Sequence, residues 1–75
     1  MMLITAALML EGRPLADRLG LRALGEEPWP VFASPEMALV VSGTGPLNAA
    51  AAAGWAMGRF PGIRAALNIG LCGAA

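Results

Sequence analysis

Apolar residues occur along the chain in short runs that alternate with two longer helical patterns. Residues 3–8 are almost uniformly apolar, which is typical of a strand buried on both faces of a sheet. Residues 37–42 and 65–69 are expected to form two further central strands. Residues 11–19 and 47–60 are typical of helices, and Pro61 and Gly62 end the second of them. Strands that alternate with helices predict an α/β fold with right-handed crossovers and a mostly parallel sheet, of the three-layer αβα Rossmann-like kind.

The most informative stretch is MALVVSGTGPLN, residues 37–48. Val40 and Val41 favour a buried strand, and Gly43 and Gly45 allow a tight turn with positive φ. Pro46 suits the first position of a helix. This strand, glycine turn and helix would direct backbone N–H groups toward a ligand above the sheet.

The first helix and the segment after it carry further local signals. The predicted helix over residues 11–19 has Pro14 in its first turn and Gly20 just after its end. Residues 21–30 are expected to form a loop, and residues 31–33 a short edge strand. Ligands of parallel sheets bind at the carboxyl ends of the strands, which here are residues 8–11, 42–48 and 68–73.

Composition and charge exclude several classes of function. The net charge is zero, so no basic surface favours nucleic-acid binding. One cysteine and no histidine make a zinc site improbable. The chain has 75 residues of which 57% are hydrophobic, more than a compact domain of that length can bury. We therefore expect residues 1–75 to be the N-terminal portion of a larger α/β domain, or half of an intimate assembly.

The apolar N-terminus does not have the pattern of a signal peptide. Residues 1–10 lack a basic start and lead directly into Glu11 and Arg13. No segment reaches the ~20 apolar residues that a membrane span needs. The single cysteine is compatible with a reducing compartment, so we expect a soluble, cytoplasmic protein without membrane contact.

Two nucleotide-binding motifs fit the glycine turn poorly. In a dinucleotide-binding fingerprint the third glycine would fall at Asn48, and about 20 residues further on there is Ala65 instead of an acid. A P-loop requires a lysine, which the chain lacks. A nicotinamide or flavin site is therefore disfavoured, and we expect no cofactor.

Three stretches together resemble a known family. LITAALMLEGRPL, VVSGTGPLNAAAA and LNIGLCGAA, in this order, are similar to the N-terminal part of the nucleoside phosphorylase and nucleosidase superfamily. Within it they look most like futalosine hydrolases, enzymes of menaquinone biosynthesis, and methylthioadenosine/S-adenosylhomocysteine nucleosidases. The resemblance covers nearly all of the chain.

The resemblance implies cleavage of the bond between a purine-type base and ribose. Phosphorylases of the superfamily carry two arginines and a Ser or Thr where this chain has Glu11, Asn68 and Leu71. A carboxylate and a leucine would not bind a phosphate dianion, whereas a carboxylate can orient and deprotonate water. A nucleosidase, which is a hydrolase, is therefore expected, and a phosphate-dependent phosphorylase is the alternative.

The resemblance also implies a set of site residues. Glu11 would position the attacking water, and the substrate would be bound by eight further residues: Ser42, Gly43, Thr44, Gly45, Asn68, Leu71, Cys72 and Gly73. In the family, the acid that protonates the departing base and the glutamate that binds the ribose hydroxyls lie past residue 75. We expect the 75-residue chain to be inactive alone, and the whole enzyme to be a dimer or larger homo-oligomer.

Simpler interpretations of the same residues remain open. Glu11 at a helix start is often a surface acid that compensates the helix dipole. Asn68 in an apolar strand could bond to neighbouring backbone, and Cys72 could be an inert buried thiol. A noncatalytic structural or interaction module is therefore the second alternative.

Overall fold

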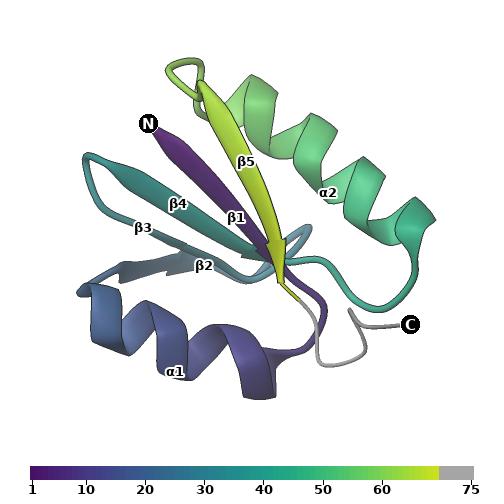
Figure 1. The fold of residues 1–75 in the computed structure, drawn as a ribbon, viewed down its shortest axis with the longest axis horizontal. Coiled ribbons are helices and arrows are strands. Elements are labelled where there is room, and N and C mark those ends of the chain that lie inside the picture. The colour runs from purple at the N-terminus through teal and green to yellow at the C-terminus, as the bar shows by residue number, and fades with distance from the viewer. Residues whose placement is uncertain (70–75) are drawn as a thin grey trace.

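The computed structural model describes residues 1–69, which form a mixed α/β unit of one sheet and two helices (Figure 1). The elements follow one another along the chain in this order: β1 (Met2–Ala6), α1 (Met9–Leu19), β2 (Arg22–Gly25), β3 (Val31–Ala33), β4 (Met37–Val41), α2 (Pro46–Arg59) and β5 (Ala65–Ile69). No helix within these residues is long and apolar enough to cross a membrane.

The sheet has the strand order β2-β3-β4-β1-β5. The three strands β4, β1 and β5 are parallel, with Ala6 of β1 level with Val41 of β4 and with Ile69 of β5. The hairpin β2–β3 continues the sheet through antiparallel pairing of β3 with β4. The sheet is therefore mixed, with two parallel and two antiparallel pairings, and not mostly parallel as expected from the sequence.

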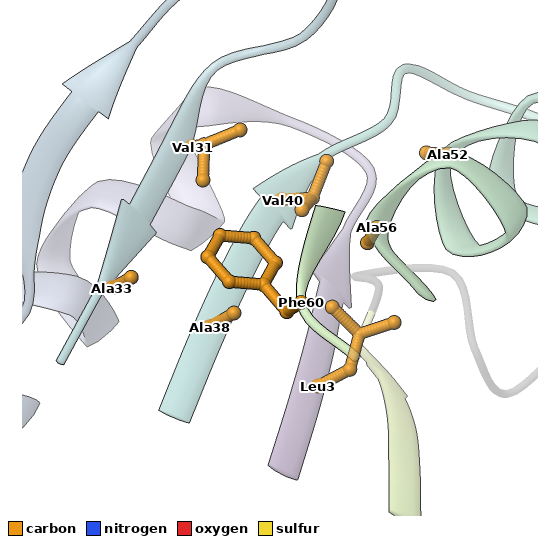
Figure 2. Close-up of a cluster of buried hydrophobic side chains, with 8 residues drawn as sticks. All are labelled: Leu3, Val31, Ala33, Ala38, Val40, Ala52, Ala56 and Phe60. Carbon is orange, nitrogen blue, oxygen red and sulfur yellow. The ribbon is translucent and has the colours of Figure 1, made fainter. Parts of the chain in front are cut away.

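Alternate residues of the central strands pack against different helices. Leu3, Ala38 and Val40 belong to a buried cluster on the face that α2 covers. Ala52 and Ala56 of α2 and Phe60, which follows the helix, complete this group, and Figure 2 shows these side chains between the sheet and α2. Ile4, Leu39 and Val41 belong to a second buried cluster, with Ala16 of α1. The strands β1 and β4 are almost uniformly apolar because α2 packs against one face of each strand and α1 against the other.

Helix α1 starts two residues earlier than the sequence predicts. The strand β1 ends at Ala6, and Leu8, which was expected to be its last residue, is instead the extended residue that precedes the helix, with φ −126° and ψ 149°. Pro14 consequently lies inside the helix rather than in its first turn. The helix ends as predicted, since Gly20 adopts a left-handed conformation with φ 69°.

Gly12 allows α1 to lie close to the sheet. A Cβ atom at this position would lie 3.0 Å from Val41 Cγ2, 3.2 Å from Leu39 Cδ2 and 3.3 Å from the Ala6 Cβ. These separations are shorter than the ~3.5–4.0 Å of ordinary carbon contacts. The absent side chain of Gly12 therefore sets the distance between the helix and the sheet.

Three expectations about strands were wrong in part. Residues 21–30 were expected to form a loop, but Arg22–Gly25 form the edge strand β2, whose side chains are all exposed. The strand β3 was expected at an edge and lies between β2 and β4, fully buried. The strand β5 has the predicted bounds, but it is the outer strand of the described sheet rather than a central one.

Candidate functional site

The carboxyl ends of β4, β1 and β5 lie side by side at one edge of the sheet. Ala6 pairs with both Val41 and Ile69, so the three parallel strands end level with one another. Near each of these ends lies a residue group that the family resemblance assigns to the site, either as the catalytic residue or as substrate-binding residues. These groups are the start of α1 with Glu11, the turn of residues 42–45, and Asn68. The parallel pairing thus brings together the predicted site residues that the structure describes.

Glu11 lies in the first turn of α1, where its carboxylate bonds to the helix start. The Leu8 backbone N–H donates to Glu11 Oε1 over 3.0 Å. The carbonyl of Leu8 in turn accepts from the backbone N–H groups of Glu11 and Gly12, each at 3.0 Å. A carboxylate near a helix N-terminus is also favoured by the helix dipole. Glu11 therefore has a structural role at this edge, whatever role it has toward a ligand.

The turn after β4 has the backbone geometry that its glycines predict. Gly43 has φ 84° and Gly45 has φ 95°, both in the region that side chains disfavour. Pro46 is the first residue of α2, as expected from the sequence. The turn therefore joins the carboxyl end of β4 to the start of α2.

Ser42 does not present a free hydroxyl to this edge. Its side chain is buried, and its Oγ donates to the carbonyl of Gly43 over 2.9 Å, with the carbonyl of Ala6 at 3.4 Å. The Ser42 backbone N–H also donates to the Ala6 carbonyl, over 2.8 Å. Ser42 thus joins the end of β4 to the end of β1. Thr44, by contrast, is exposed at the tip of the turn.

Asn48 contributes to the turn in a way that the sequence did not reveal. Its Nδ2 donates to the carbonyl of Thr44 over 2.7 Å, which closes the turn onto the first turn of α2. In the sequence, Asn48 was considered only as a residue that does not match a glycine motif. Its spacing of four residues from Thr44 at a helix start is the signal that could have indicated this bond.

Asn68 is paired with a buried threonine of the neighbouring strand. Thr5 Oγ1 donates to Asn68 Oδ1 over 2.9 Å, and the two residues are level in the parallel pairing of β1 and β5. Thr5 is buried, whereas Asn68 is exposed. The sequence left open a bond from the Asn68 side chain to neighbouring backbone, whereas the bond in the structure is to the Thr5 side chain. Thr5 was not among the predicted site residues.

The described part of the site can orient a ligand and offer one carboxylate. It has the Glu11 carboxylate, the exposed Thr44 and the Asn68 amide, and within residues 1–69 no group of three His, Cys, Asp or Glu side chains could hold a metal ion. Leu71, Cys72 and Gly73, which were predicted to bind substrate, lie outside the described residues. A hollow of about 290 Å³ beside α1 is lined by none of the predicted site residues.

Three comparisons with known proteins found no similar protein. Neither the protein-family models, nor the curated proteins, nor the solved structures contain a match to this chain.

Proposed function

We propose that this chain is the N-terminal portion of an N-ribosyl hydrolase that cleaves the base–ribose bond of a purine-type nucleoside, such as futalosine or methylthioadenosine. In this proposal the sheet and its two helices are the first part of a three-layer αβα Rossmann-like domain. The whole enzyme would be a cytoplasmic homo-oligomer that uses neither a cofactor nor a metal.

The observation that carries the proposal is the convergence of three strand ends at one edge. Because β4, β1 and β5 are parallel and end level, Glu11, the turn of residues 42–45 and Asn68 share that edge. Ligands of open α/β sheets bind at this position. The positive φ angles of Gly43 and Gly45 allow the turn to lie close to a ligand.

The chemistry assigned to this edge is activation of water by Glu11. The bond from the Leu8 N–H to Oε1 fixes the direction of the carboxylate at the start of α1. A fixed carboxylate can orient a water molecule and accept its proton as the base–ribose bond breaks. A carboxylate at this point also opposes binding of a phosphate dianion, which favours hydrolysis over phosphorolysis.

The proposal is tested by base release in phosphate-free buffer. The longer protein in which the proposal places this chain should release the base from futalosine or methylthioadenosine, and the 75-residue chain alone should not. Glu11→Gln should abolish turnover but leave nucleoside binding, because the amide keeps an acceptor for the Leu8 N–H. Glu36→Gln is a matched control, since Glu36 is exposed and precedes β4 at the opposite edge of the sheet. Turnover that depends on added phosphate would instead indicate a phosphorylase.

One observation favours a second candidate, a structural or interaction module without catalysis. The bond from the Leu8 N–H to Glu11 is what a purely structural acid at a helix start would make. A module of this kind would gain no stability from nucleosides. A nucleoside site would be stabilised by about 2.7 kcal/mol at a ligand concentration of 100 Kd, which thermal unfolding detects.

A further inference from the structure

A hollow of about 290 Å³ lies between α1 and the β2–β3 hairpin, apart from the predicted nucleoside site. Met9 and Arg13 of α1 line one side of it, and the residues of the hairpin and its loop line the other. Since Pro30 accepts a bond from the Val41 backbone N–H, the hairpin loop is next to the carboxyl end of β4. The hollow therefore lies near the same end of the sheet, on the side that α1 covers.

The walls of the hollow combine apolar side chains with polar groups in about equal parts. Met9, Leu24, Pro30 and Phe32 contribute most of its large side chains. Phe32 is buried in the core, whereas Met9 and Leu24 are 36% and 47% exposed. A ligand in the hollow would cover this exposed apolar surface, and its removal from water would favour binding.

Two opposite charges also line the hollow, and each lacks a partner among residues 1–69. Arg13 comes from α1 and Glu26 from the loop after β2. Within the described residues neither side chain forms an ion pair, and the two do not pair with each other. The hollow therefore offers one donor group of positive charge and one acceptor group of negative charge over an apolar floor.

We propose that this hollow binds a small zwitterion with an apolar side chain, of the class of the free α-amino acids leucine, methionine and phenylalanine. The ligand's carboxylate bonds to the Arg13 guanidinium, its ammonium bonds to the Glu26 carboxylate, and its side chain contacts Leu24 and Phe32. A purely anionic ligand would be repelled by Glu26, and a purely cationic ligand by Arg13. The volume of about 290 Å³ lies just below the ~300–1,000 Å³ of ligand pockets, which suits a ligand of amino-acid size.

The experiment is a titration of the isotope-labelled 75-residue chain with L-leucine, followed by the NMR amide signals of residues 23–26. Two analogues each remove one charge: L-leucinamide lacks the carboxylate, and N-acetyl-L-leucine lacks the ammonium. Arg13→Gln and Glu26→Gln remove the matching protein charges. Arg18→Gln is the control, because Arg18 is an exposed arginine of the same helix that does not line the hollow.

We expect saturable binding of L-leucine in the millimolar range. Arg13→Gln should weaken L-leucine about threefold to fivefold, as expected for one exposed ion pair, and should not weaken L-leucinamide, whose positive charge Arg13 repels. Glu26→Gln should weaken L-leucine similarly and should not weaken N-acetyl-L-leucine, whose negative charge Glu26 repels. Absence of saturation, or equal weakening of L-leucine by Arg18→Gln, would overturn the proposal. No nucleoside enters the assay, so the result is independent of the proposed nucleosidase activity.

Discussion

Replacement of Gly12 by alanine tests whether α1 is held at its present distance from the sheet by the absence of a side chain. The new Cβ would lie 3.0 Å from Val41 Cγ2, 3.2 Å from Leu39 Cδ2 and 3.3 Å from Ala6 Cβ. Leu39 and Ala6 are fully buried, and the Ala6 Cβ is attached directly to the backbone of a central strand. The Val41 and Leu39 methyl groups can shift by side-chain movement, but the contact with the Ala6 Cβ can be relieved only if the helix or the strand moves.

Two opposing free energies decide the effect on stability. Alanine favours a helix interior by about 0.8–1.0 kcal/mol over glycine. Overpacking of a tight core costs about 1–3 kcal/mol. The net result should be a loss of about 1 kcal/mol, which lowers the Tm of a domain of this size by about 4–8 °C.

Gly54→Ala is the matched control because Gly54 lies in the interior of α2 with no atom within 4 Å of a built Cβ. It gains the helix propensity without the contact and should raise the stability by about 0.8–1.0 kcal/mol. The propensities cancel in the comparison of the two variants, so their difference measures the overpacking alone. Urea unfolding followed by far-UV circular dichroism gives both free energies. If Gly12→Ala is stabilised as much as Gly54→Ala, the close helix–sheet contact is not real.

Two further substitutions test the groups at the strand ends. Asn68→Ala leaves the buried Thr5 hydroxyl without its acceptor and should lower the free energy of unfolding by about 1–3 kcal/mol. The double variant with Thr5→Val should lose less stability than the sum of the two single variants. Additive losses in urea unfolding would contradict the bond. Gly45→Ala places a side chain at φ 95° and should lower the free energy of unfolding by about 1–3 kcal/mol; an unchanged Tm would show that the turn does not need a glycine there.

The sequence predicts the central elements well because their patterns are local. The apolar runs of β1, β4 and β5 and the Gly-Thr-Gly-Pro turn each contain the reason for their structure within a few residues. The strand β2 has no such signal: its four residues are exposed, include an arginine and a glycine, and are ordered by pairing with β3. Its formation depends on a contact that composition does not encode.

In the candidate site, too, only the local features were predicted. Gly43 and Gly45, which belong to one short turn, have the predicted conformations. The partners of Glu11 and Asn68 depend on where α1 begins and on the register of β1 with β5, neither of which the sequence determines locally. The start of α1 was misjudged because Leu8 continues the apolar run of β1 although its backbone already belongs to the helix start.

Both helices contact the sheet mainly through residues that have no side-chain torsions. Gly12 and Ala16 of α1 and Ala52 and Ala56 of α2 are all buried against it. Glycine and alanine lose no rotamer entropy on burial, so fixing these contacts has no side-chain conformational cost. Because these residues have no rotamers to exchange, the helices also cannot repack against the sheet by rotamer changes at these four positions. The first turns of α1 and α2 are therefore pre-organised beside the strand ends before any ligand arrives.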